Sequence, residues 1–184
     1  MKIMRSIIFS FLFIILATGF VPAQQQDGVP IAAMKIAPPQ TSDLTKSFDE
    51  FSLDLPNETW RVTNKTANPE IIYGDRLDGY LQIRKLAVDQ GTTLADVIDR
   101  EINQKLQFKP GFVNGKEENF KGNLSGKAAN YEYTGSGKAM IGRVYFLQAD
   151  NKTVYVLHFT GLRDKLRLLR NQTDAIARSF ELKK

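Results

Sequence analysis

The sequence lacks cysteine altogether and has a single histidine, His158, among its 184 residues. Without thiols, the chain has no disulfide to staple its fold and no cysteine nucleophile. One histidine without cysteine also disfavours a zinc site, because zinc sites in proteins draw on several ligands of these two types. We therefore expect no cofactor and no catalytic residue, in a domain that depends on its hydrophobic core alone.

The longest apolar run, residues 7–20, spans 14 residues, fewer than the roughly 20 that a membrane-crossing helix needs. Lys2 and Arg5 precede it, and Val21-Pro22-Ala23 supplies small residues for cleavage after Ala23. This is the layout of a secretory signal peptide. No cysteine follows the run, which excludes a lipid-anchored lipoprotein. We expect residues 1–23 to be a signal peptide and the mature protein to be exported, periplasmic or secreted.

Residues 24–47 show no sustained period and contain Gly28, Pro30, Pro38 and Pro39, a composition typical of a flexible linker or arm. The remaining residues, 48–184, are enough for one domain.

Strands and helices alternate within this domain. Phe51, Leu53 and Leu55 alternate with polar residues, and a hairpin is expected over residues 71–88. Three further strands are separated by turns at residues 135–137 and 150–151. Apolar residues at helical spacing predict two helices, over residues 93–108 and 162–178. Tight turns between neighbouring strands imply an antiparallel sheet, so the predicted fold class is α+β.

A two-residue loop at Asp150-Asn151 would pair Tyr145 with Val156 and Arg143 with His158. His158 would then share a sheet face with Arg143 and Tyr145. No nucleophile and orienting acid accompany it at the spacing of a triad. We expect His158 to be structural, and this sheet face to be one candidate partner-binding surface.

Charge is unevenly distributed along the chain. Residues 41–108 hold 8 basic and 12 acidic side chains, whereas residues 109–184 hold 14 basic and 7 acidic ones. Arg163, Arg167 and Arg170 form one stripe on the last helix, with Lys165 nearby. The stripe is either a solvated face or a docking surface for an acidic partner or anionic lipid. Nucleic acid is not expected as a partner of an exported protein that lacks a stacking motif.

Acidic residues offer weaker candidates. Asp75 and Asp78 invite a calcium interpretation, but the twelve-residue EF-hand pattern is absent. We expect no metal there, and a hairpin turn instead. A hydrolase that uses carboxylates such as Asp75, Asp78 or Glu132 stays open, because paired carboxylates catalyse only when a cleft holds them together.

Three segments, taken in order, carry a resemblance: "FDEFSLDLPNETWRV", then "LQIRKLAV", then "LRNQTDAIARSFEL". Residues 48–182 resemble the PsbP-like domain, whose relatives include exported bacterial DcrB-type proteins. The resemblance implies an αβα sandwich around a twisted antiparallel sheet. It also implies a binding or accessory role without enzymatic activity, and it transfers no binding residue.

Together these observations predict an exported, non-enzymatic domain that docks on or stabilises a protein partner in the cell envelope. The alternatives are a carboxylate-dependent hydrolase, a small-ligand-binding protein, and a protein that binds an anionic membrane surface.

Overall fold

The computed structural model describes residues 45–184. The predicted signal peptide and residues 24–44 of the predicted linker lie outside this range. In chain order the elements are β1 (Thr45–Ser47), β2 (Phe51–Asp54), β3 (Trp60–Asn64), β4 (Glu70–Tyr73), β5 (Gly79–Ala87), α1 (Leu94–Ile98), the π-helical η1 (Asp99–Gln104), β6 (Val113–Lys121), β7 (Ser125–Gly135), β8 (Lys138–Gln148), β9 (Thr153–Leu162), α2 (Arg163–Leu168), α3 (Arg170–Ser179) and β10 (Glu181–Leu182).

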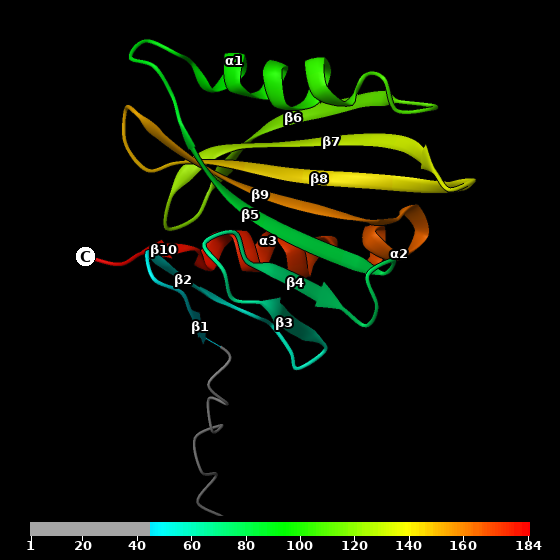
Figure 1. Cartoon of the computed structure of the whole chain (residues 1–184), viewed down its shortest axis with the longest axis horizontal. Helices are drawn as coiled ribbons and strands as arrows, with labels where there is room; N and C mark the ends of the chain where they lie inside the picture. The colour runs from blue at the N-terminus through cyan, green and yellow to red at the C-terminus, as the bar shows by residue number, and fades with distance from the viewer. Residues whose placement is uncertain (1–44) are drawn as a thin grey trace, which may run out of the picture. The chain divides into compact units, whose positions relative to one another are not determined.

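Two antiparallel sheets organise the domain. Seven strands form the large sheet in the order β3-β4-β5-β9-β8-β7-β6, and β1, β2 and β10 form a small one. Figure 1 shows α1 on one face of the large sheet and α3 on the other. This layering is an αβα sandwich, which confirms the predicted α+β fold with an antiparallel sheet flanked by helices. Strand β1 pairs with β2 and lies within the predicted linker, at its C-terminal end.

Strands β8 and β9 lie at the centre of the large sheet and are buried on both faces. Their middle residues, 144–147 and 154–157, are all buried, in the near-continuous apolar run that is typical of a strand covered on both sides. One face packs against α1 and η1, and the opposite face packs against α2, α3 and the small sheet. The alternation along these two strands therefore decides which helix layer each side chain meets.

The β8–β9 register differs by one residue from the predicted register. The strands pair Val144 with His158 and Gln148 with Val154. The turn contains three residues, 150–152, in which Asp150 Oδ1 accepts a hydrogen bond from the Lys152 backbone N–H at 2.7 Å. A one-residue slip moves every side chain to the other face. The prediction that His158 faces Arg143 is therefore wrong.

The helix boundaries follow their sequence signals. Thr93 and Asp96 form a capping box at the start of α1. Val97, Ile98 and Ile102, which recur at the helical spacing from which this helix was predicted, are buried. The last helix is interrupted at Leu169, where ψ is 4°. Its predicted apolar stripe nevertheless stays on one side, and the stripe is buried from residue 166 onward.

Strand β6 was not predicted from the sequence. Seven of its first eight residues are exposed, and Phe120 alone in the strand is buried. An edge strand that faces solvent on both sides carries no apolar alternation, so nothing in its composition separates it from a loop. Two of its residues, Glu118 and Phe120, nevertheless contact the residues beneath α3.

Gly142 on β8 makes room for an aromatic ring. Tyr131 on β7 is its cross-strand partner, and a Cβ at position 142 would overlap the Tyr131 ring. The ring therefore lies across the glycine, and its hydroxyl reaches His158 on β9 at 2.5 Å.

We predict that Gly142→Ala lowers the free energy of unfolding by about 1–3 kcal/mol, the usual cost of overpacking a core. Urea denaturation of the two proteins measures this difference. In a Tyr131→Leu background the same change should cost clearly less, because the ring that it meets is gone. Equal costs in both backgrounds would contradict the packing described here.

Candidate functional site

Four cations of α2 and α3 form a charged array that we call the helix-face cations. Their side chains are 41–59% exposed, and each lies within 4.0 Å of a carboxylate. The ion pairs are Arg163–Glu132 at 3.5 Å, Arg167–Glu132 at 2.7 Å, Arg170–Glu118 at 3.2 Å and Lys165–Asp78 at 3.9 Å. The stripe predicted from the sequence is present, and its cations pair with carboxylates of β6, β7 and the β4–β5 turn.

Arg143 lies beneath this array, and its side chain is only 7% exposed. Its guanidinium donates to Glu118 at 2.7 Å and to Asp174 at 2.8 Å. It also donates to Asn130 at 3.0 Å and to the Tyr145 hydroxyl at 2.6 Å. Burial acts to lower the pKa of Arg143, but Tyr145, Glu118 and Asp174 outweigh it and the pKa is raised. Arg143 is thus a fixed cation at every physiological pH.

A hollow of about 200 Å³ opens between this buried arginine and the helices. We call it the arginine hollow; it is lined by Asn130, Ile141, Arg143, Leu166, Arg167 and Arg170. Three arginines and one asparagine thus line the space together with two aliphatic side chains, and the lining is mainly apolar. The guanidinium groups of these arginines pair with Glu118, Asp174 and Glu132.

His158 lies on the opposite face of the sheet, where it is half-buried. Its Nε2 and the Tyr131 hydroxyl are 2.5 Å apart. Burial lowers the pKa of His158 to about 4, and the positive charges of Arg84 and Lys109 act in the same direction. The imidazole is therefore neutral at pH 7. Tyr145 likewise lies on the face of Arg143, away from His158.

The carboxylates of the acidic candidates Asp75 and Glu132 already have hydrogen-bond or ion-pair partners nearby. Asp75 Oδ1 accepts hydrogen bonds from the backbone N–H groups of Leu77 at 2.6 Å and Asp78 at 3.2 Å. This is an Asx turn, which a hairpin uses without an ion. Glu132 lies between Arg163 and Arg167. Among residues 45–184, no group of three or more histidine, aspartate or glutamate side chains is placed to hold a metal ion.

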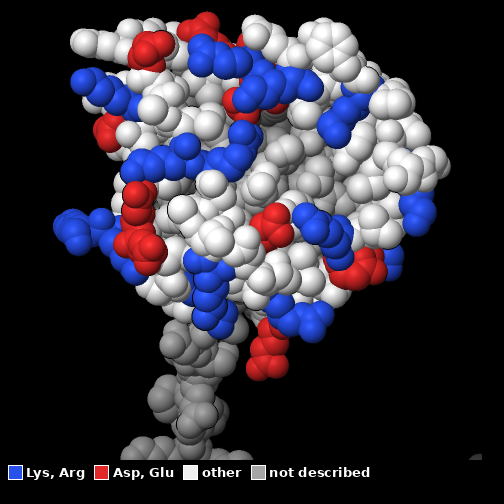
Figure 2. Space-filling view, in the orientation of Figure 1, with Lys and Arg blue, Asp and Glu red and all other residues white. Residues whose placement is uncertain are grey.

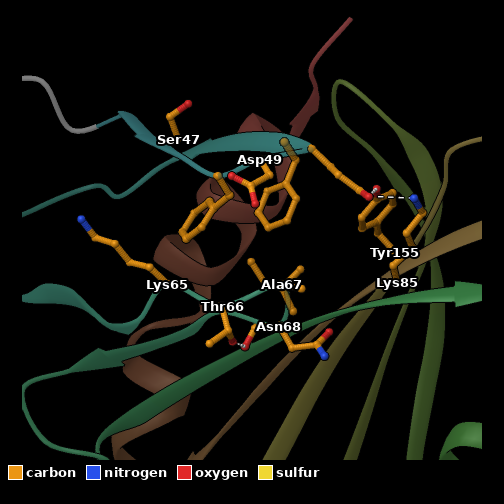
Figure 3. Close-up of a pocket in the computed structure, with 12 residues that line it drawn as sticks. Ser47, Asp49, Lys65, Thr66, Ala67, Asn68, Lys85 and Tyr155 are labelled. Atoms are coloured by element: carbon orange, nitrogen blue, oxygen red, sulfur yellow. Dashed lines mark hydrogen bonds and ion pairs between the residues drawn. The ribbon is translucent and has the colours of Figure 1, made fainter.

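A second hollow, of about 300 Å³, lies between the two sheets (Figure 3). We call it the inter-sheet pocket. Its walls are the β1–β2 turn and the β3–β4 loop, and its floor comes from β5 and β9. At one end Glu50 Oε2 accepts hydrogen bonds from Lys85 and from the Tyr155 hydroxyl, both at 2.8 Å. No sequence pattern predicts this pocket, because four separate segments build it.

Cations and anions interleave on the face that carries β4 and β5. Figure 2 shows more surface from lysine and arginine than from acidic residues on this face, around a hollowed patch of uncharged side chains. The buried Glu101 forms ion pairs with Arg84 at 2.7 Å and with Lys105. Burial acts to raise the pKa of Glu101, but these two partners outweigh it and the pKa is lowered.

No helix among the described residues is long and apolar enough to cross a membrane.

No model of a protein family and no curated protein matches the chain. Several solved structures, however, match the chain. LpqN of Mycobacterium tuberculosis, a protein involved in cell envelope biogenesis, matches with a TM-score of 0.51 and 20% identity, over 73% of this chain and 84% of LpqN. Cyanobacterial PsbP of Synechocystis sp. PCC 6803 matches with a TM-score of 0.53 and 13% identity, over 82% of this chain and 99% of that one.

The Ran-binding protein Mog1p of Saccharomyces cerevisiae also matches, with a TM-score of 0.54 and 8% identity, over 74% of this chain and 96% of Mog1p. At these identities the likeness concerns the fold alone. The chain therefore has the PsbP-like fold that its sequence predicts. A relation to the DcrB-type proteins stays a prediction.

We predict that Arg143→Met lowers the free energy of unfolding by about 2–4 kcal/mol, because Glu118 and Asp174 lose the cation between them. Arg170→Met is the matched control. It removes an exposed arginine that also pairs with Glu118, and it should cost no more than about 1 kcal/mol. Urea denaturation compares the two variants, and equal costs would contradict the assignment of Arg143 as the centre of the cluster.

A second prediction concerns pH. Because the folded-state pKa of His158 is about 4, below the ordinary value of 6.5, the unfolded chain binds this proton more readily. The stability that neutral His158 contributes is complete above about pH 6.5 and falls as the pH drops, by about 2–3 kcal/mol near pH 4.

His158→Gln removes this titration, so its stability should fall less between pH 7 and pH 4 than that of the unsubstituted protein. Urea midpoints at several pH values give both curves. Parallel curves would show that His158 is not held neutral by the fold.

Proposed function

We propose that the protein is an exported, non-enzymatic accessory domain that docks on an acidic protein partner in the cell envelope. The docking surface is the helix-face cations together with the arginine hollow beneath them. The observation that carries this proposal is the set of half-exposed arginines Arg163, Arg167 and Arg170, which lie beside the hollow of about 200 Å³. An aspartate or glutamate side chain of a partner can pair with these guanidinium groups.

The ion pairs of the array favour binding in a second way. Arginine loses side-chain entropy when a partner fixes it, and an arginine that already rests against a carboxylate loses less. Glu132 and Glu118 hold Arg167 and Arg170 at 2.7 Å and 3.2 Å. Leu168 lies between Arg167 and Arg170 in the sequence. Its side chain is 81% exposed and adds apolar area to the same surface. Arginine beside apolar area is the composition that protein interfaces favour.

Export and an envelope role are supported by two independent features. The N-terminal 23 residues have the layout of a signal peptide. The fold is shared with LpqN, which is involved in cell envelope biogenesis. We infer that this protein too acts outside the cytoplasm, as a domain that presents surface to a partner.

A non-enzymatic role is supported by the way in which reactive groups are placed. His158 is neutral and hydrogen-bonded to Tyr131, on the face opposite the arginine hollow. The carboxylates considered for hydrolysis are held in a turn or between arginines. Acid–base catalysis needs such groups to converge on one substrate position, and these groups lie against separate partners.

We predict that Arg163→Gln/Arg167→Gln/Arg170→Gln abolishes the specific capture of an acidic partner. Glutamine is used because glutamate would repel Glu118 and Glu132. In-cell crosslinking of the tagged protein, followed by identification of the captured proteins, gives the readout. The proteins lost in the triple variant should have acidic surfaces, and their recovery should fall at high salt.

The matched control is Arg100→Gln/Lys116→Gln/Lys121→Gln, which removes the same charge from exposed residues elsewhere in the fold. It should capture the same proteins as the unsubstituted chain. Identical capture by both triple variants would reject the docking surface. A second test is flotation with anionic liposomes. If the arginine triple variant alone stops floating but still captures the same proteins, the partner is a lipid surface and not a protein.

A further inference from the structure

We propose that one end of the large sheet binds the surface of an anionic phospholipid membrane, with Phe108 inserted between the headgroups. We call this end the lysine tip; it comprises Phe108, Lys109, Val113 and Lys138. It shares no residue with the helix-face cations or with the lining of the arginine hollow. The proposal therefore stands apart from the docking function.

Two segments that are separate in the sequence form the lysine tip. Phe108 and Lys109 lie in the loop between η1 and β6, and Lys138 is the first residue of β8, after the β7–β8 turn. The Thr134 N–H donates a hydrogen bond to the Pro110 carbonyl at 2.7 Å, which joins the two segments. Figure 1 shows both at the same end of the sheet, with the β8–β9 turn at the opposite end.

The loop between η1 and β6 holds Phe108 outside the core. Its side chain is 83% exposed, whereas Leu106 and Phe112 on either side of it pack against the core beneath α1. The Lys109 N–H donates to the Leu106 carbonyl at 2.9 Å, and the Phe112 N–H donates to the Lys109 carbonyl at 3.1 Å. Val113, which is 61% exposed, adds a second exposed apolar side chain to the same end. Exposed apolar side chains that gather in this way mark an interaction surface.

The lysines of the tip carry a charge that no carboxylate neutralises. Lys109 Nζ lies 4.6 Å from the centroid of the Tyr133 ring, and Lys138 is exposed. Within the part of the chain that the structure describes, neither ammonium group forms an ion pair. Residues 105–114 and 133–142 contain no aspartate or glutamate. The helix-face cations differ, since each of them lies beside a carboxylate.

This composition favours a membrane over a protein as the partner. Protein interfaces are enriched in arginine and depleted in lysine, and residues 105–114 and 133–142 contain lysine but no arginine. The anionic headgroups of a membrane attract lysine, and the region just below them accepts aromatic and aliphatic side chains. A lysine can keep its ammonium group among the headgroups while its methylene chain contacts apolar groups. Phe108 and Lys109 provide both kinds of contact on one loop.

The absence of cysteine from the chain allows a site-specific test, because a single introduced cysteine is the only thiol that a fluorophore can label. Gln107→Cys, labelled with nitrobenzoxadiazole, reports on the tip and keeps Phe108. Asn151→Cys is the matched control, since it replaces an exposed amide in the β8–β9 turn at the opposite end of the sheet. The vesicles contain equal parts of phosphatidylcholine and phosphatidylglycerol, with a nitroxide-labelled lipid as quencher. We expect a blue shift and quenching of the fluorophore at the tip, and neither in the control.

The affinity for these vesicles, measured from the same signal, assigns the residues. Phe108→Asn should weaken binding by about tenfold, because the inserted ring is lost. Lys109→Gln/Lys138→Gln should weaken it by about fivefold for each lysine at low salt, and much less at about 1 M salt, where the attraction is screened. Leu168→Asn removes a side chain of similar exposure, 81%, from the docking surface, and should leave the affinity unchanged.

The proposal would be overturned by no quenching at the tip, or by equal quenching of the two labelled proteins. An equal loss of affinity in Phe108→Asn and Leu168→Asn would also contradict it. Loss of a crosslinked protein in Phe108→Asn, without loss of vesicle binding, would assign the tip to a protein and reject the membrane.

The Arg163→Gln/Arg167→Gln/Arg170→Gln variant should keep the fluorescence response at the tip. A failure of the lysine tip is therefore distinguishable from a failure of the docking surface.

Discussion

The structure depends on the burial of β8 and β9 on both faces. Their central residues, 144–147 and 154–157, are buried without interruption, so each strand supplies apolar contacts to the α1 layer and to the α2–α3 layer in turn. Without disulfides, this double burial is the main source of stability that the chain has. Successive side chains of a strand lie on opposite faces of the sheet. The register of β8 against β9 therefore also decides which side chains lie together on one face.

The two faces carry different chemistry as a result. On the α3 side, Arg143 gathers Glu118, Asp174 and Tyr145 from three elements and places a fixed cation beneath the helix-face cations. On the α1 side, His158 is neutral beside Tyr131. A polar cluster that is nearly buried costs stability unless every member is satisfied, and Arg143 meets this condition with four partners. Arg143 is therefore a fixed part of the lining of the arginine hollow.

The sequence was a good guide to local structure and a poor one to contacts across the fold. The capping box at Thr93, the buried stripe on the last helix and the alternation of Phe51 and Leu53 were predictable, because each depends on neighbours within a few residues. The β8–β9 register was not predictable, because the residues of a two-residue turn and of a three-residue turn are of the same kinds. Glu118 and Asp174 were not recognised as partners of Arg143, because they lie 25 and 31 residues away. The inter-sheet pocket, built from four segments, leaves no local pattern at all.

The separation of the arginine cluster from His158 is the central claim, and it follows from one register. Backbone cross-strand NOEs in the NMR spectrum of the protein test it directly. The structure predicts NOEs that pair Val144 with His158 and Tyr145 with Leu157. NOEs that pair Arg143 with His158 would put both on one face and contradict the account.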